Sequence, residues 1–495
     1  MRLRIFPLFK IVSFLLFFVL SLSVSAQADE AWNRVMRTKE LRWGGDAAGG
    51  APYVFPNSRK PSEMVGFEVE ILEALSRQLN VRPVFVNVPW DQLVPALMRG
   101  DFDMAFNGLE VTKDRLAVID FSIPYYFFSE QLTVRNDDNA IREFSDLPGR
   151  RVGTLSASLA KNILEQDGRI EVISYPSPVE VYRDLDIGRL DAALMDIPIA
   201  AYYATLNPKL KNVGKSVGDG IYAGGIRKDA PLLKAKINQA LIAIIRSGEL
   251  ERIYRKWYMW NKDQGKLSQA ATRYSQNVEG KKSLWKFTGL LLKGAGMTVI
   301  LSLLAMMLAV VAGSMLCVGK LYGNVWVRFF CHAYIEIIRG TPLLIQLYLL
   351  YYGLPNLGIQ LSAFVAAVLG LGLNYAAYEA EIYRAGLLSI AKGQDEASRS
   401  LGMTGWQSLK YVIAPQAIRT ILPPSTNDFI ALFKDTSLVS IITVTELTRA
   451  YSQAATTTYR FLELGLATAL LYFLMSFPLS LWSRSMEKKR HAAFH

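Results

Sequence analysis

Residues Asp395 to Pro424 read DEASRSLGMTGWQSLKYVIAPQAIRTILPP, and this polar stretch decides how the second half of the chain is organised. It lies between hydrophobic stretches, whereas the first half of the chain has the composition of a soluble, extracytoplasmic domain. We expect a helical segment with Glu396 and Ala397 to end at Gly402, and a second short helix to begin at Thr404. Two short helices at an angle on a membrane surface suit docking into a partner protein.

The composition places part of the chain in a membrane. Of 495 residues, 51% are hydrophobic, and the mean hydropathy is +0.19, which is too high for an ordinary soluble protein of two or three domains. The formal net charge is +12, but many Lys and Arg residues flank apolar stretches, where cytoplasmic loops collect positive charge. We therefore do not expect nucleic-acid binding.

Cysteine, histidine and nucleotide-binding motifs exclude several chemistries. The two cysteines, Cys317 and Cys331, both lie in the hydrophobic half, so the first half has no disulfide. The chain has neither HExxH nor CxxC, and we predict no metal site. It also lacks GxxxxGK[ST], so we expect it to hydrolyse no ATP by a P-loop and to rely on a separate subunit for that activity rather than to be an enzyme itself.

The N-terminus and the middle of the chain predict three boundaries. Residues 1–28 combine basic side chains, an apolar run and Ala26-Gln27-Ala28, the pattern of a signal peptide, with an uncleaved anchor as the alternative. Residues 29–260 alternate short β-branched or aromatic runs with helical patterns, which predicts a parallel α/β sheet. Residues 261–285 are polar and predict a linker, and residues 286–490 predict the membrane domain.

Long uncharged runs predict the membrane spans. Gly294 to Gly319 suits one span, Gly340 to Tyr378 suits two spans joined by a turn, and Leu464 to Trp482 suits a last one. Charged residues interrupt Phe429 to Leu447. If this segment is nevertheless counted as a span, the polar stretch and the basic tail lie on the same, cytoplasmic side. This gives about five spans, an extracytoplasmic N-terminal domain and a cytoplasmic C-terminus.

Four segments of the first half carry a family resemblance. They are residues 66–71 (GFEVEI), 90–97 (WDQLVPAL), 108–115 (GLEVTKDR) and 121–126 (FSIPYY). Together they resemble the periplasmic amino-acid-binding family over nearly all of Leu41 to Trp257. The resemblance implies two α/β lobes, joined by two crossing strands near Gln131 and Gly224, that close on one small solute.

A selective binding site for an amino acid needs a planar group with two donors for the carboxylate and acceptors for the ammonium group. The resemblance implies Arg115 for the carboxylate and Asp196 for the α-ammonium. Ser158 opens a helical pattern whose N-terminal N–H groups suit the second carboxylate oxygen, with a simple N-cap as the alternative reading. Glu110 stands where relatives carry Ser or Thr. We expect Glu110 to bind the α-ammonium together with Asp196, to contact a cationic side chain of the solute, or to be a surface residue paired with Lys113.

Aromatic and loop residues complete the expected amino-acid site. Trp90 is one wall for the solute's aliphatic part, and Tyr53 or Tyr126 replaces the stacking aromatic that the family carries in its first loop, with a place in the core as the alternative for either tyrosine. Asp46 is a candidate for contact with a cationic side chain. In the loop before Glu110, the adjacent residues Asn107 and Gly108 are expected to supply amide and backbone contacts.

The second half carries two further resemblances. Residues 334–346 (YIEIIRGTPLLIQ) and 375–386 (YAAYEAEIYRAG) resemble polar-amino-acid permeases of the histidine, glutamine, arginine and opine group. The stretch 395–424 resembles the coupling loop of bacterial ABC importers at Glu396, Ala397 and Gly402. This implies a separate cytoplasmic ABC ATPase that uses ATP, no cofactor bound by this chain, and a homodimer or a paired permease.

Three ionisable residues close to the polar stretch have two readings. Glu379, Glu381 and Arg384 line a translocation path, as intramembrane charges often do, or they form an ion pair at the cytoplasmic end of a helix. We favour the ion pair.

The predicted fold class is a two-lobe α/β periplasmic-binding-protein fold followed by an all-α membrane domain. The predicted function is an amino acid ABC transporter subunit of the bacterial cytoplasmic membrane that combines solute capture with the permease. A ligand-gated channel is the first alternative, but its filter, such as TVGYG, is absent from the sequence. An enzyme on the binding-protein scaffold is the second, and it leaves the fused permease unexplained.

Overall fold

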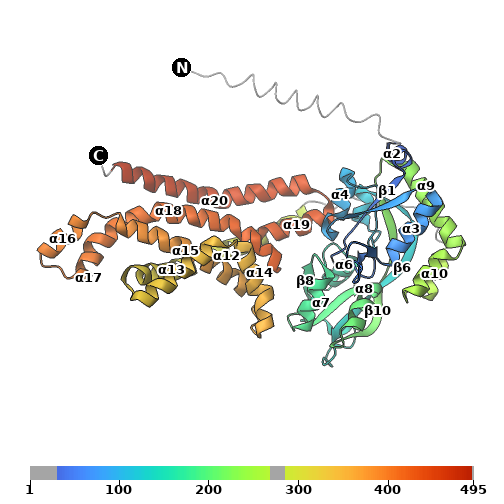
Figure 1. Cartoon of the computed structure of the whole chain (residues 1–495), viewed down its shortest axis with the longest axis horizontal. Coiled ribbons are helices and arrows are strands. Elements are labelled where there is room, and N and C mark those ends of the chain that lie inside the picture. Colours follow the sequence, from blue (N-terminus) through green and yellow to red (C-terminus); the bar gives the residue numbers. More distant parts are fainter. Residues whose placement is uncertain (1–29, 49, 268–284, 493–495) are drawn as a thin grey trace, which may run out of the picture. The chain divides into compact units, whose positions relative to one another are not determined.

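The computed structural model of the chain describes residues 30–48, 50–267 and 285–492. It contains two compact units, Met1–Lys281 and Lys282–His495, drawn from blue to green and from yellow to red in Figure 1. The predicted signal peptide and most of the predicted linker lie outside the described residues.

The first unit is built on an eight-stranded sheet in the order β4-β1-β5-β10-β6-β9-β7-β8. In the first lobe, β1 pairs in parallel with β4 and β5, and in the second lobe β7 pairs in parallel with β8 and β9. The strands are β1 (Glu40–Gly45), β4 (Arg82–Asn87), β5 (Met104–Ala105), β7 (Arg151–Leu155), β8 (Glu171–Tyr175) and β9 (Ala192–Asp196), and a separate hairpin contains β2 (Phe55–Pro56) and β3 (Met64–Val65).

Two long strands connect the lobes. They are β6 (Asp120–Arg135) and β10 (Leu210–Ile226), which pair antiparallel with several register shifts. Gln131 and Gly224 belong to these strands, so the predicted pair of crossing strands is confirmed. Ligands of open α/β sheets bind beyond the carboxyl ends of parallel strands, and here those ends carry the loops after β1, β5, β7 and β9.

Helices cover the sheet of the first unit, which confirms the predicted α/β alternation. Local signals fix some of their ends: α3 ends at Asn80 in the left-handed conformation (φ 53°), and α6 begins at the N-cap Ser158. The helices are α2 (Glu30–Thr38), α3 (Phe67–Leu79), α4 (Leu93–Arg99), α5 (Lys113–Val118), α6 (Leu159–Gln166), α7 (Pro178–Asp186), α8 (Ile197–Leu206), α9 (Pro231–Arg246) and α10 (Glu249–Lys256).

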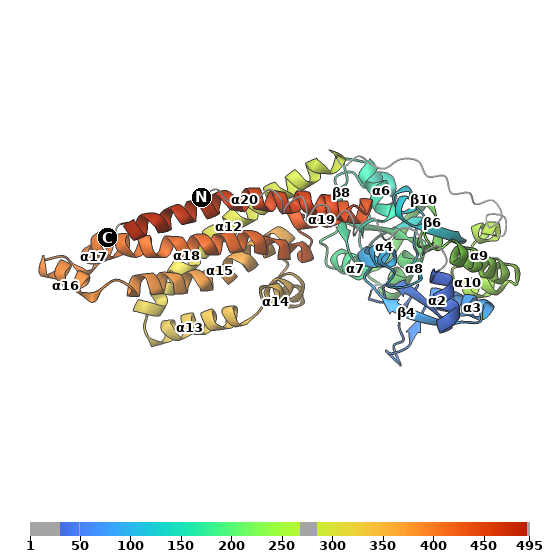
Figure 2. The same ribbon diagram turned by 90° about the horizontal axis from the view of Figure 1, so that it is seen from above.

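The second unit is helical throughout its described residues, and α15, α18 and α20 run alongside one another in Figures 1 and 2. Small residues let the central helix α15 approach α12 closely: a Cβ on Gly372 would lie 2.7 Å from the Leu308 side chain. The helices are α12 (Trp285–Tyr322), α13 (Val325–Gly340), α14 (Leu343–Tyr348), α15 (Ala363–Leu388), α16 (Lys392–Ser400), α17 (Gly405–Ser408), α18 (Ala414–Asp435), α19 (Leu447–Thr458) and α20 (Phe461–Ala492).

The structure revises the predicted spans. Among the described residues, 3 helices are long and apolar enough to cross a membrane, namely Phe287–Tyr322, Ala363–Leu388 and Phe461–Ser483. A fourth span results only if Val325–Gly340 and Leu343–Leu357, which meet at 105°, count as one. Of the two spans predicted within Gly340 to Tyr378, the second corresponds to α15, whereas the first, Leu343–Leu357, reaches span length only together with Val325–Gly340, from which Pro342 separates it.

The predicted span Phe429 to Leu447 is also misplaced. The helix in this region, α18, starts at Ala414 and ends at Asp435, where a 3-10 turn over Thr436–Ile442 follows. Its first half was predicted as part of the polar docking stretch. Packing against α15 and α20 makes this region one long helix, which the charge pattern alone does not reveal.

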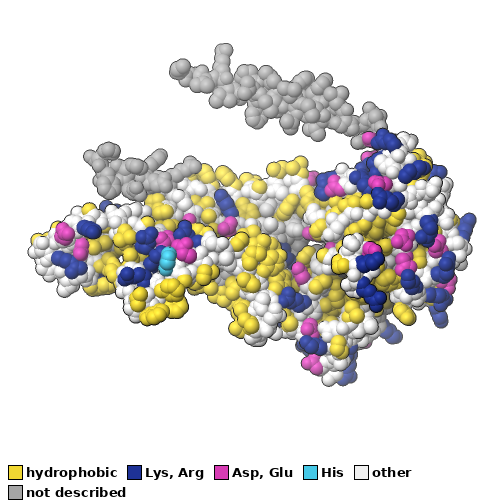
Figure 3. Space-filling model, in the orientation of Figure 1, with side chains coloured by type: hydrophobic (Ala, Val, Ile, Leu, Met, Phe, Trp, Pro, Cys, Tyr) yellow, Lys and Arg dark blue, Asp and Glu magenta, His cyan; other side chains and the backbone are white. Residues whose placement is uncertain are grey.

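Hydrophobic side chains cover much of the visible face of the helical unit (Figure 3). On α12, Leu303, Met307 and Met315 are exposed by 55%, 62% and 70%. Such a surface is unfavourable in water and is expected of helices that face lipid.

Candidate functional site

A cavity lies between the two lobes, at the carboxyl ends of their parallel strands. Most of the residues predicted to bind the solute line it, namely Asp46, Tyr53, Trp90, Asn107, Gly108, Glu110 and Asp196. Hydrogen bonds cross the cleft on several sides: the Trp90 indole N–H donates to the Ser156 carbonyl at 3.0 Å, and the Tyr53 hydroxyl to Asp196 at 3.2 Å. The lobes are therefore closed around the cavity.

Arg115 lies in the first turn of α5 and is 3% exposed. Its guanidinium donates to the Glu110 carbonyl oxygen at 2.8 Å and to the Glu110 carboxylate at 3.1 Å. It also donates to the Ala157 carbonyl of the second lobe at 2.9 Å and lies over the Trp90 ring, 5.1 Å from its centre. Arg115 is thus a buried donor fork at the cleft, paired with Glu110 in this structure.

Glu110 reaches from the first lobe to the N-terminus of α6 in the second. Its carboxylate accepts hydrogen bonds from the Leu159 N–H at 3.0 and 3.1 Å, in addition to those from Arg115. The reading of Glu110 as a surface residue paired with Lys113 is therefore wrong, because Glu110 is 3% exposed and pairs with Arg115. Its carboxylate occupies the donors that the sequence assigned to a solute carboxylate.

Ser158 is the N-cap of α6. Its hydroxyl accepts from the Lys161 N–H at 3.1 Å and donates to the Leu155 carbonyl at 2.8 Å. The N-cap reading of this residue is confirmed. Ser158 does not line the cavity among the described residues, but it fixes the helix terminus whose Leu159 N–H faces Glu110.

Asp196 lies at the end of β9 and accepts hydrogen bonds from two phenols. These are the hydroxyls of Tyr53 and of Tyr222 on β10, which lie 2.8 Å from each other. Tyr53 therefore contributes its hydroxyl to the site. Tyr126 packs in the core against the Tyr222 ring and donates to the Met259 carbonyl at 3.0 Å, so of its two readings the core position is confirmed and the stacking wall is wrong.

The loops after β1 and β5 hold each other in place. The Asp46 carboxylate accepts from the Trp90 N–H at 3.0 Å, and the Asn107 side-chain oxygen accepts from the Asp46 N–H at 3.1 Å. The Gly108 N–H donates to Glu68 at 2.7 Å, and a Cβ at Gly108, where φ is +62°, would lie 2.6 Å from the Tyr53 ring. These contacts shape the cavity wall from the first lobe.

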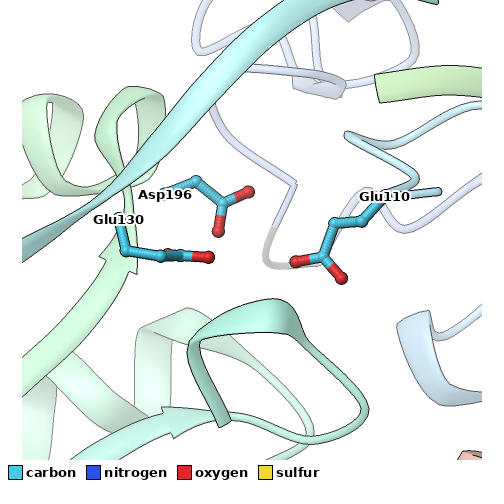
Figure 4. Close-up of side chains that lie close together, drawn as sticks. All are labelled: Glu110, Glu130 and Asp196. Atoms are coloured by element: carbon cyan, nitrogen blue, oxygen red, sulfur yellow. The ribbon is translucent and has the colours of Figure 1, made fainter. Parts of the chain in front are cut away.

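Sequence reasoning missed Glu130. It lies on β6 directly opposite Asp196 in the antiparallel register and is completely buried. Figure 4 shows the carboxylates of Glu110, Glu130 and Asp196 directed towards one another, and oxygen atoms from all of them lie within 4.8 Å. An acidic residue inside the apolar strand FSIPYYFFSEQLTV was the available signal.

Burial perturbs these carboxyl groups. Loss of hydration raises the pKa of Glu110 to about 7, although the Arg115 charge opposes this rise. Burial, with the charges of Asp196 and Glu110, raises the pKa of Glu130 well above its usual range. Burial also raises the pKa of Asp196, against the hydrogen bonds from Tyr222 and Tyr53. Burial therefore raises the pKa values of all three carboxyl groups.

The two short helices predicted within residues 395–424 form at one end of the helical unit, and we call these helices and the turn between them the elbow. Gly402, with φ +83°, follows the end of α16, and Thr404 caps α17 with a reciprocal bond to Gln407. The Ser408 hydroxyl donates to Asp395 at 2.6 Å and joins the two helices. These helices confirm the predicted local geometry of the elbow, in which Glu396, Ala397, Leu401 and Trp406 are exposed.

The nearby charges in α15 form ion pairs. Glu381 pairs with Lys320 at 2.6 Å and with Arg384 at 2.8 Å, as the ion-pair reading predicts. Glu379 is buried and accepts from the Ser425 hydroxyl at 2.7 Å. A separate cavity of this unit is lined by residues that include Arg339, Asn374, Tyr375, Asp428 and Asp435.

Comparisons with known proteins match both halves of the chain. Bacterial extracellular solute-binding proteins, family 3, match residues 41–259, and the binding-protein-dependent transport system inner membrane component matches residues 295–491. The glutamine transport system permease protein GlnP of Escherichia coli strain K12 is 36% identical over 209 residues, which are 42% of this chain and 95% of that protein.

A second relative is the probable amino-acid ABC transporter permease protein YckA of Bacillus subtilis strain 168. It is 36% identical over 198 residues, which are 40% of this chain and 88% of that protein. Among solved structures, an ancestral arginine-binding protein bound to glutamine covers 45% of this chain and 99% of its own, with 28% identity and a TM-score of 0.43.

The two halves together define a membrane transport protein with a fused extracytoplasmic binding domain. The chain belongs to the amino-acid ABC transporter family, as a subunit that joins solute binding to the permease. The predicted fold class and function are confirmed, and the matches give no support to the channel or enzyme alternatives.

Proposed function

We propose that the chain captures a polar amino acid between its lobes and passes it to a permease that is driven by a separate cytoplasmic ATPase. One observation carries this proposal: Arg115, a donor fork, and Asp196, an acceptor, are both buried at the same cleft. A carboxylate and an ammonium group at fixed spacing match such a pair. The binding domain faces outside the bacterial cytoplasmic membrane, and the C-terminus lies in the cytoplasm.

Binding requires an exchange of partners at Arg115. In the empty cleft, Arg115 and the Leu159 N–H hold the Glu110 carboxylate. An incoming carboxylate takes these donors, and Glu110 is released towards the cationic part of the solute. The α-ammonium is received by Asp196, whose carboxylate already accepts from Tyr53 and Tyr222.

Coupling to ATP hydrolysis is assigned to the elbow of α16 and α17. Leu401 and Trp406 are 81% and 70% exposed there, which is unusual for such large apolar side chains and suits a protein partner. The hydrogen bond from Ser408 to Asp395 makes the elbow rigid enough to transmit a push. ATP is used by the partner, and this chain binds no cofactor.

The permease is expected to act as a homodimer or with a paired permease. One helical unit provides half of a pore in this family, and the sequence contains no internal repeat that would supply the other half. A conformational change of the two permease domains would then carry the solute across the membrane.

Reconstituted transport tests this function. The chain and the ATPase subunit that co-purifies with it are placed in proteoliposomes, and accumulation of labelled polar amino acids is followed with and without ATP. We expect accumulation only with ATP and the ATPase, and its loss in Arg115→Ala. Flux without the ATPase would support a channel instead.

A further inference from the structure

Three buried carboxylates from three parts of the first unit cluster at the cleft: Glu110 and Asp196 line its cavity, and Glu130 lies next to Asp196 in the strand register. Glu110 comes from the loop after β5 in the first lobe, Asp196 from the end of β9 in the second, and Glu130 from the connecting strand β6. They are 3%, 5% and 0% exposed. Figure 4 shows that their carboxylate groups point into one common space.

Their hydrogen-bond partners are unequal. Glu110 has Arg115 and the Leu159 N–H, and Asp196 has the hydroxyls of Tyr53 and Tyr222. Both carboxylate oxygens of Glu130, in contrast, are buried and make no hydrogen bond of ordinary geometry among the described residues, although the Asp196 carboxyl and the Ala160 N–H lie close to this side chain. Burial favours the protonated form of Glu130, and an ionised Glu130 calls for a cation that a solute would supply.

The charges around these carboxylates indicate which kind of solute supplies the cation. Among the described ion pairs, Arg115 is the cation that faces these three carboxylates. A zwitterionic amino acid adds one anion and one cation, so the deficit of positive charge remains. A solute with a second cation reduces the deficit, and its own carboxylate still engages Arg115.

We propose that the transported solute is an amino acid with a cationic side chain and that Glu130 binds one of its two cationic groups. This inference rests on the proposed function of amino-acid capture at the same cleft. Glu130 and Asp196, side by side in the strand register, receive one cation. Glu110, displaced from Arg115 by the solute carboxylate, is left to pair with the other cation. Arg115 disfavours a simple diamine, which has no carboxylate to engage the guanidinium.

A matched pair of ligands tests the charge directly. The full chain in lipid nanodiscs is titrated calorimetrically with arginine and with citrulline, which replaces the guanidinium by a neutral group of similar shape. Ornithine and glutamine form a second pair for a solute with an ammonium group. In at least one pair we expect the cationic member to bind at least about tenfold more tightly, as for a buried charged contact.

Two variants locate the effect. Glu130→Gln keeps the shape and removes the charge, and we expect it to reduce the preference for the cationic member by about tenfold or more. Asp184→Asn is the control, because Asp184 is buried in an ion pair with Arg189 in the second lobe and lies outside the carboxylate cluster. It should leave the preference unchanged. If Glu130→Gln does not fold, the ligand pairs still test the charge on the wild-type chain.

The outcomes separate the inference from the function on which it rests. Equal or tighter binding of the neutral members overturns the cationic solute while amino-acid capture stands. A preference that survives Glu130→Gln overturns the role of Glu130. Binding of calcium, manganese or zinc with the amino acid absent, lost in Glu130→Gln, assigns the cluster to a metal and overturns the inference. No binding of any amino acid overturns the proposed function itself.

Discussion

The guanidinium of Arg115 donates to the carboxylate of Glu110 at 3.1 Å, inside a cleft where both side chains are only 4% exposed. The pair joins two residues that the sequence assigned separately, one to the solute carboxylate and the other to a cation. Their contact means that the Glu110 carboxylate engages the donors that suit a solute carboxylate. A solute must therefore compete with Glu110, and it gains most if it offers Glu110 a new cation in return.

Replacement of Arg115 tests whether its guanidinium binds the solute carboxylate. Arg115→Ala should weaken amino-acid binding by at least ~2 kcal/mol, as for a truncated buried charge pair. Arg115→Lys keeps the charge but not the planar fork, and it should lie between wild type and Arg115→Ala. Calorimetric titration of the full chain measures both. Near-normal affinity of Arg115→Ala would rule out this role.

The elbow offers a backbone test of coupling. A Cβ on Gly402 would meet nothing within 4 Å, so only the left-handed φ of +83° penalises a substitution there. Gly402→Val should therefore distort the turn and abolish ATP-driven uptake, while solute binding stays intact. Gly402→Asn tolerates this conformation and should retain most uptake. If Gly402→Val transports at the wild-type rate, the elbow does not couple the subunits.

Solute affinity should rise with pH. The carboxyl groups of Glu110, Glu130 and Asp196 have raised pKa values in the empty cleft, with Glu110 at about 7. Arg115 opposes this rise, and a bound cation also favours the ionised forms, so binding releases protons. We expect tighter binding as the pH increases from about 5 to about 8. Calorimetry in buffers of different ionisation enthalpy counts the protons, and proton uptake would contradict this account.

Glu68 should make the first unit less stable at alkaline pH. It is completely buried on α3, where its carboxylate accepts from the Gly108 N–H at 2.7 Å and the Tyr125 hydroxyl at 2.5 Å. Burial raises its pKa from 4.5 to about 8. The folded state holds this proton more tightly than the unfolded state, so the stabilisation is complete below about 4.5 and is lost as the pH rises to about 8.

Glu68→Gln removes this titration. The unfolding free energy of the variant should therefore fall less between pH 5 and 8 than that of the wild type, by an amount on the order of a few kcal/mol at most. Hydrogen exchange of α3 peptides, followed by mass spectrometry on the full chain, measures the difference. Identical pH profiles for the two proteins would show that Glu68 is not protonated in the fold.

The local parts of this structure were predictable from sequence. Gly402 and Thr404 end and begin helices through their own conformational preferences, and both do so in the structure. The long α18 was not predictable from the same region, because its extent depends on packing against α15 and α20. The apolar run from Gly340 did not reveal that its first helix joins Val325–Gly340 at a sharp bend beside Pro342.

The site residues that belong to sequence motifs were predictable, whereas the residues that strand pairing brings to the site were not. Most of the predicted ligands line one cavity, because they follow the strands whose carboxyl ends meet there. Glu130 and Tyr222 belong to the two connecting strands, and only the pairing of β6 with β9 and β10 brings them to Asp196. A pattern along the sequence contains no information on that pairing.

The most direct test of amino-acid capture is calorimetric titration of the full chain in nanodiscs against the twenty amino acids. The account predicts saturable binding of one amino acid per chain, tightest for a cationic one. It also predicts that this binding is lost in Arg115→Ala. Absence of binding by every amino acid in a folded preparation would contradict the account.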